Sequence, residues 1–155
     1  MRSLFIISAM LTGQFFFSDG PITKFIDPTG TYTLMGTVKK NQVISHSGEI
    51  RVRLLDSGKL AICFYMNKGY PGYQSGSFID TLPYIENAAR YTSPADTNCT
   101  IVFQFTLRAV EIMALYNTPQ CTCGFGAGVI TAAVFDKSSG DKPVIQDLAA
   151  HRISS

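Results

Sequence analysis

The sequence has little charge. Only 15% of its 155 residues are charged, and the formal net charge is +2. Nucleic-acid binding normally needs a concentrated basic face, so these totals do not indicate a nucleic-acid partner. Disorder as the dominant state is also excluded, because 46% of the residues are hydrophobic and the net charge is small.

Residues that build metal centres are scarce. The only histidines are His46 and His151, and they lack the short spacing of a paired metal ligand. Cys121 and Cys123 are separated by one residue, which is not a thioredoxin-type motif, and no second cluster completes a zinc site. We therefore expect no metal site and no cofactor.

A convergent set of nucleophile, base and acid is missing as well. His46 lies between two serines in a predicted loop, and a general base needs a rigid orienting partner. Asp80 and Glu86 are close in sequence, but nothing fixes the separation that a glycosidase pair requires. We expect a non-enzymatic protein with no catalytic residues. A hydrolase would require His46 to lie within hydrogen-bond reach of a serine and a carboxylate.

One long uncharged run is present, at the N-terminus. Arg2 gives a positive start, and residues 4–17 carry no charge. This pattern predicts a secretory signal peptide over residues 1–18, with cleavage near Ser18 or after Gly13. The run is short for a membrane span, which needs about 20 residues. We expect a periplasmic or secreted protein with no membrane span, in a compartment where disulfides form.

Strand formers and turn signals alternate through the rest of the chain. Residues 49–54 alternate apolar and polar side chains, which is the period of a half-buried strand. Both faces of residues 60–66 are rather apolar, so this strand is expected to be covered on each side. The full set of expected strands is 31–38, 49–54, 60–66, 77–82, 87–92, 99–107, 109–115 and 129–135.

About eight short antiparallel strands predict an all-β domain, most simply a single up-and-down barrel and alternatively a β-sandwich. The domain spans residues 19–138, followed by a tail, 139–155, that holds at most a short helix or is disordered. A barrel of this size has room for side chains or one small ligand. The predicted fillers of its interior are Phe64, Phe103, Phe105 and Phe135.

The stretch from Tyr65 to Phe78 is the candidate binding surface. It places tyrosines on and beside a Gly/Pro loop, and tyrosine gives a large contact area with a polar tip at small entropic cost. Alternatively, the tyrosine rings plug the mouth of the barrel. The candidate binding residues are Asn67, Lys68, Tyr70, Tyr73, Ser75 and Phe78.

Several short motifs resemble small exported β-barrel proteins of Gram-negative bacteria, which are lipocalin-like or lysozyme-inhibitor-like domains. The resemblance covers roughly residues 28–138. Its motifs are Gly30-Thr31-Tyr32, Gly48-Glu49-Ile50-Arg51-Val52, Ala89-Arg90-Tyr91, Asn98-Cys99 with Ile101, Phe103 and Phe105, and the run Cys123-Gly124-Phe125-Gly126-Ala127-Gly128-Val129.

The resemblance implies a disulfide between Cys99 and Cys123. Their separation agrees with this, because a loop of that size gives about 3 kcal/mol in the chain-entropy model. Cys121 is a rival partner, and Cys63 lies mid-strand, where a free cysteine packs as a small hydrophobe.

Lysozyme-inhibitor barrels present a Ser-Gly-x-x-Tyr loop to the enzyme's two-carboxylate cleft. Here Ser75-Gly76 matches only the first two residues, and an aromatic, Phe78, comes one position early. The predicted signal peptide, the run of strands, the implied disulfide and the tyrosine-bearing stretch together favour an exported binding module. We expect it to bind a protein or a glycan, with inhibition of an envelope-attacking hydrolase as one form. The alternative is a lipocalin-like carrier of a small apolar ligand.

Overall fold

The computed structural model describes residues 23–55, 58–118 and 120–147. The predicted signal peptide, residues 1–18, lies outside this part of the chain. The described residues form ten strands: β1 (Gly30–Leu34), β2 (Val38–Lys39), β3 (Gln42–Val43), β4 (Ser47–Leu55), β5 (Lys59–Asn67), β6 (Ser75–Pro83), β7 (Ala88–Ser93), β8 (Asp96–Phe105), β9 (Ala109–Tyr116) and β10 (Ala133–Ser139).

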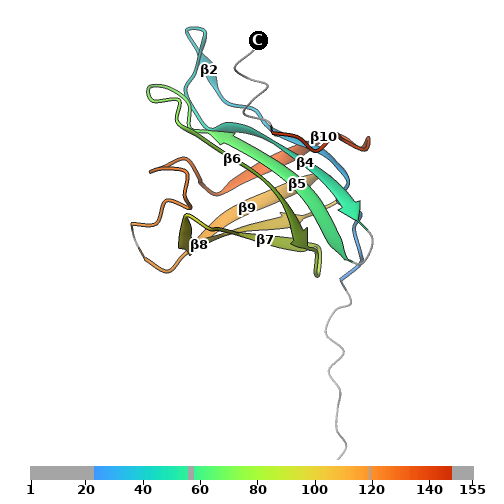
Figure 1. Ribbon diagram of the computed structural model, residues 1–155. Coiled ribbons are helices and arrows are strands. Elements are labelled where there is room, and N and C mark those ends of the chain that lie inside the picture. The colour runs from blue at the N-terminus through green and yellow to red at the C-terminus, as the bar shows by residue number, and fades with distance from the viewer. Residues whose placement is uncertain (1–22, 56–57, 119, 148–155) are drawn as a thin grey trace, which may run out of the picture.

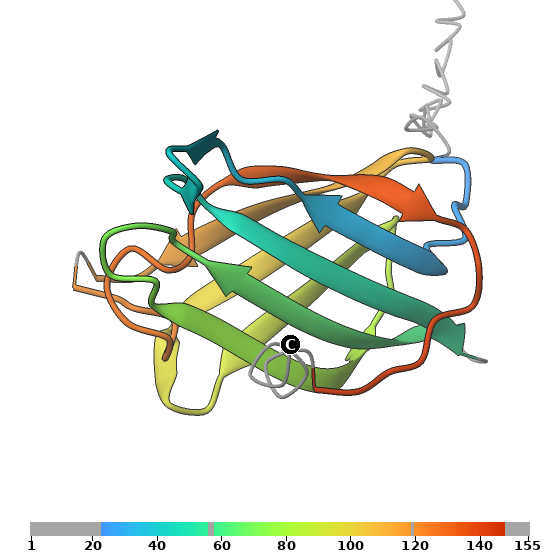
Figure 2. The same ribbon diagram turned by 90° about the horizontal axis from the view of Figure 1, so that it is seen from above.

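Eight of the strands form one antiparallel sheet in the order β6-β5-β4-β1-β10-β9-β8-β7, and β2 and β3 form a separate hairpin. Apart from that hairpin, inserted between β1 and β4, and from β6 and β7, which stand at the two ends of the order, strands that follow one another in the chain are paired. β1 pairs with β10 and brings the two halves together. The sheet curls into a nearly closed barrel (Figures 1 and 2). It is open along one line, between β6 and β7, which we call the seam. The predicted antiparallel barrel is confirmed.

Alternating side chains fill the barrel. On β5, Leu60, Ile62, Phe64 and Met66 point inward and are fully buried. The four predicted fillers, Phe64, Phe103, Phe105 and Phe135, are all buried, and Phe64 contacts Phe103 edge to face with ring centroids 5.8 Å apart. The interior is therefore a packed aromatic core.

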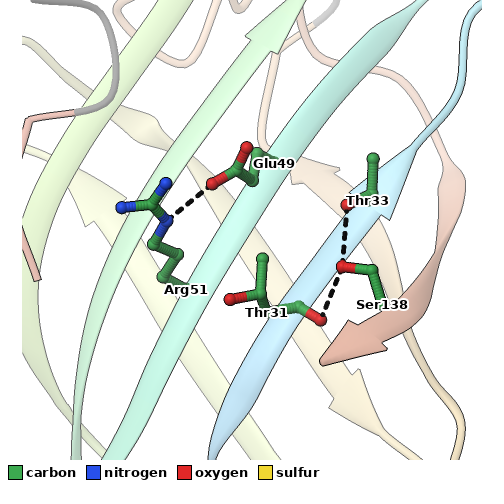
Figure 3. A network of polar contacts seen from close by, with 5 residues as sticks. All are labelled: Thr31, Thr33, Glu49, Arg51 and Ser138. Atoms are coloured by element: carbon green, nitrogen blue, oxygen red, sulfur yellow. Dashed lines mark hydrogen bonds and ion pairs between the residues drawn. The ribbon is translucent and has the colours of Figure 1, made fainter. Parts of the chain in front are cut away.

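Polar side chains occupy the outer face of β4, β1 and β10. On β4, Arg51 Nε donates to Glu49 Oε1 at 2.6 Å. The Ser138 hydroxyl bonds the hydroxyl of Thr33 and donates to the carbonyl of Thr31, joining β10 to β1 (Figure 3). The outer face of these strands is therefore polar and partly exposed, as the alternation in residues 49–54 predicts.

The outer face of β5 is covered by the segment after β10, residues 140–147. Ile145 packs against Cys63 and Tyr65, which are both buried although they point away from the core. Burial raises the pKa of the Cys63 thiol. The prediction that this strand is covered on both sides is confirmed.

The structure is all-β. A short helix was one expectation for the tail, residues 139–155. Residues 140–147 form no helix, and residues 148–155 lie outside the described part of the chain.

Residues 23–29 close the end of the barrel that lies opposite the β2–β3 hairpin (Figure 1). The hydroxyl of Tyr32 donates to the carbonyl of Pro28, and that of Tyr84 donates to the carbonyl of Ile26, each at 2.8 Å. Burial raises the pKa of both phenols, that of Tyr84 to about 12. The side chain of Asn87 completes this closure by bonding the main chain of Lys24 and Ile26.

Two expected strands differ from the structure. The last strand begins at Ala133 rather than at Val129, because Val129 and Ile130 are buried in the loop that precedes it. The strand expected over 31–38 ends at Leu34, and a short hairpin with positive φ at Lys40 and Asn41 follows. Such a hairpin has too few residues for a period-2 pattern, so the polar run from Lys39 to Ser47 predicts only a loop or an irregular hairpin tip at this place.

Candidate binding surface

The loop between β5 and β6, residues 68–74, is held in one conformation by the side chain of Asn67. We call it the tyrosine loop. Asn67 Nδ2 donates to the carbonyl of Tyr73, and Asn67 Oδ1 accepts from the N–H of Gly69, each at 2.7 Å. Main-chain bonds within the loop add to this, from Tyr73 N–H to Gly69 O at 2.9 Å and from Lys68 N–H to Gln74 O at 3.0 Å. One amide side chain therefore ties both limbs of the loop together.

The tyrosine loop lies directly against the β2–β3 hairpin. The N–H of Tyr70 donates to the carbonyl of Val43 at 2.7 Å. Gly69 has a φ of +78°, and a Cβ there would lie 2.6 Å from the carbonyl oxygen of Ser45 and 2.8 Å from that of Val43. Only glycine allows this approach. Residues 35–46 and 67–75 thus form one continuous surface, which we call the end surface (Figures 1 and 2).

The end surface presents apolar and aromatic side chains to solvent. Tyr70 is 50% exposed and Tyr73 is 45% exposed, and their rings meet edge to face with centroids 6.2 Å apart. Met35, Val38 and Ile44 are exposed beside them. The tyrosines do not plug the mouth of the barrel.

The charge of the end surface is of one sign. Lys39 and Lys40 lie at the hairpin, and Lys68 lies in the tyrosine loop, while residues 35–46 and 67–75 contain no aspartate or glutamate. The lysines of the hairpin were not among the predicted binding residues. The sequence does show these two adjacent lysines in a polar stretch, but only the fold places them beside the tyrosine loop.

Five of the predicted binding residues, Asn67, Lys68, Tyr70, Tyr73 and Ser75, lie in the end surface. Ser75 begins β6 opposite Asn67 and is exposed. Phe78 lies elsewhere, because it points inward and stacks on Tyr91 across the seam with ring centroids 3.6 Å apart. We therefore leave Phe78 out of the end surface.

Ser75-Gly76 has a packing explanation. A Cβ on Gly76 would lie 2.5 Å from the ring of Phe125, so the glycine makes room for that ring. Phe125 in turn lies within 6.5 Å, centroid to centroid, of Phe64, Phe78 and Tyr91. The ring closes the barrel beside the tyrosine loop.

The loop from 117 to 132 is anchored at the same end of the barrel. A disulfide joins Cys123 to Cys99 at the start of β8, as the resemblance implies, and Cys63 and Cys121 are free thiols. Asp96 accepts from the N–H of Thr122 at 2.8 Å and from the thiol of Cys121. These bonds lower the pKa of Asp96, while burial and the Asp96 contact raise that of Cys121, so the thiol stays protonated.

The candidate base, His46, has a structural partner. His46 Nε2 bonds the carbonyl of Gly128 at 2.8 Å, which joins the hairpin segment to the 117–132 loop. In residues 23–55, 58–118 and 120–147, no group of three or more His, Cys, Asp or Glu side chains is arranged to hold a metal ion. No helix within those same ranges has the length and apolar character to cross a membrane.

No family model, curated protein or solved structure matches this chain. The resemblance to lipocalin-like and lysozyme-inhibitor-like domains therefore stays a prediction from short motifs.

Proposed function

We propose that the protein is a non-enzymatic exported binding module that recognises a protein or a glycan with its end surface. The observation that carries the proposal is the exposed Tyr70–Tyr73 pair on a loop that Asn67 and the β2–β3 hairpin hold in place. Solvent-exposed aromatic rings are costly to leave in water, and a preordered loop loses little entropy when it binds.

The charge of the end surface defines the partner further. With Lys39, Lys40 and Lys68 and no acidic residue in the two segments, the end surface is complementary to an acidic one. An acidic glycan fits this description, and so does a hydrolase whose active-site cleft carries carboxylates. Inhibition of an envelope-attacking hydrolase would follow if the tyrosine loop entered such a cleft.

Export supports the same proposal. The Cys99–Cys123 disulfide is typical of an oxidising compartment, and residues 1–18 have the pattern of a signal peptide. The periplasm or the extracellular space is therefore the place where we expect the partner.

The filled interior favours this function over that of a carrier. The largest fully buried side chains, among them Tyr32, Phe64 and Phe103, occupy the space that an apolar ligand would need. We therefore do not propose the carrier.

The test compares the wild type with the double variant Tyr70→Ser/Tyr73→Ser on glycan arrays, on immobilised envelope-active hydrolases and in lysozyme activity assays. The control is Leu107→Ser, because Leu107 is 75% exposed in the turn after β8, at the other end of the barrel. We expect the double variant to bind at least tenfold more weakly and the control to bind as the wild type does. Equal binding by all three proteins would overturn the proposal.

A further inference from the structure

The seam offers a second surface, distinct from the end surface. β6 and β7 stand at the two ends of the sheet order, so neither pairs with a strand on its outer side within the described residues. A single bridge, Ile85 to Ala88, joins them at the turn through Glu86 and Asn87, and beyond it the two strands diverge. Edge strands of this kind accept further strands unless something protects them.

The direction of the main-chain groups on β6 follows from its pairing with β5. The N–H of Lys68 donates to Gln74 at one end of this pair, and the N–H of Tyr84 donates to Gly58 at the other. Along an antiparallel ladder, every second residue of a strand turns its N–H and C=O toward the partner strand. Counted from Gln74 or from Tyr84, the even-numbered residues of β6 face β5. The main-chain groups of Ile79 and Thr81 therefore face the seam.

The Thr81 N–H shows how this edge is protected. It donates to Oδ1 of the neighbouring Asp80 at 2.7 Å. The carboxylate oxygen therefore takes the place that a carbonyl of an added strand would take. Ile79 is 50% exposed on the same edge.

A groove of about 490 Å³ lies at the joined end of the seam, around the Ile85–Ala88 bridge. Its apolar lining comes from Pro83, Ile85, Ala88 and Ala89, and Glu86, Arg90 and Gln104 complete it. Further along, the stacked rings of Phe78 and Tyr91 close the seam from inside. The groove has the composition of a pocket for an apolar side chain beside a charged rim.

We propose that the seam binds an extended, basic peptide segment of a partner protein, which adds to β6 as a further strand. The peptide pairs with Ile79 and Thr81 and places one apolar side chain in the groove. A peptide carbonyl replaces Asp80 at the Thr81 N–H, and the released Asp80 carboxylate favours a basic peptide, while Glu86 and Arg90 give the groove rim one charge of each sign.

The probe is an acetylated, amidated peptide of four Lys-Val repeats, added to isotope-labelled protein and followed by NMR and amide hydrogen exchange. We expect shifts and slowed exchange at the amides of Ile79 and Thr81, and at least tenfold weaker binding by a peptide of four Glu-Val repeats. Thr81→Pro should lower affinity at least tenfold, because it removes an N–H that the β5 ladder does not use. Thr81→Ala, which keeps the N–H, and Tyr70→Ser/Tyr73→Ser should bind as the wild type does.

Shifts confined to the end surface, or no protection of Ile79 and Thr81 at millimolar peptide, would overturn the proposal without touching the end surface. A concentration-dependent dimer that Thr81→Pro dissociates would overturn it too, since β6 would then pair with a second copy. Thr81→Pro is checked by circular dichroism, and the wild-type exchange data decide the question by themselves if that variant does not fold.

Discussion

Replacing Asn67 with alanine removes the side chain that holds the tyrosine loop. The two bonds at 2.7 Å, to the carbonyl of Tyr73 and from the N–H of Gly69, are lost together. An intramolecular hydrogen bond contributes about 0.5–1.5 kcal/mol net, so the free energy of unfolding should fall by about 1–3 kcal/mol. The loss should be concentrated in residues 68–74, because the strands on either side keep their ladder.

Urea unfolding gives the overall change, and backbone NMR relaxation gives its location. Gln74→Ala is the matched control, since Gln74 is exposed in the same loop and contributes its carbonyl to the bond with Lys68. We expect Asn67→Ala to raise fast motion at Gly69 to Tyr73 and to weaken partner binding, whereas Gln74→Ala changes neither. A loss below about 0.5 kcal/mol with an unchanged loop would show that the loop does not depend on Asn67.

Three further predictions concern the elements that position the end surface and cover β5. Gly76→Ala should cost about 1–3 kcal/mol in urea unfolding, because its Cβ would meet the Phe125 ring, and Gly140→Ala, with open space around it, should cost nothing. Asp96 has a folded-state pKa below its ordinary 3.8, so its contribution to stability is complete above that value and is lost as the pH falls through the folded pKa. The stability difference between wild type and Asp96→Asn should therefore shrink from pH 6 to pH 2, and a constant difference would contradict this sign. Ile145→Ala should let a thiol reagent modify Cys63 several-fold faster, as read by peptide mass mapping with Cys121 as the internal reference; an unchanged rate would mean that Ile145 does not shield the thiol.

The sequence predicts the barrel well where alternation is long. Residues 49–54 and 60–66 alternate over enough positions to define a strand and its inner face, and the structure places both in the sheet with slightly longer bounds. The last strand was misplaced because Val129 and Ile130 favour a strand locally. Burial in the loop, beside the disulfide of Cys123, overrides that preference.

The candidate site was predicted in part for a similar reason. Tyr70 and Tyr73 stand out because they flank a Gly/Pro loop, and closeness in sequence added Phe78 to them. Its place in the alternation of β6 sends Phe78 inward, where it meets Tyr91 from another strand. The hydrogen bonds from the Tyr70 N–H to the Val43 carbonyl and from the Thr122 N–H to the Asp96 carboxylate join segments far apart in the chain, and no local pattern reveals such pairs.

Hydrogen exchange of the protein with and without its bound partner tests the end surface most directly. We predict that slowed exchange is confined to residues 35–46 and 67–75, with the strongest protection in the tyrosine loop. Protection centred on the outer face of β9 and β10, with the tyrosine loop unchanged, would contradict it.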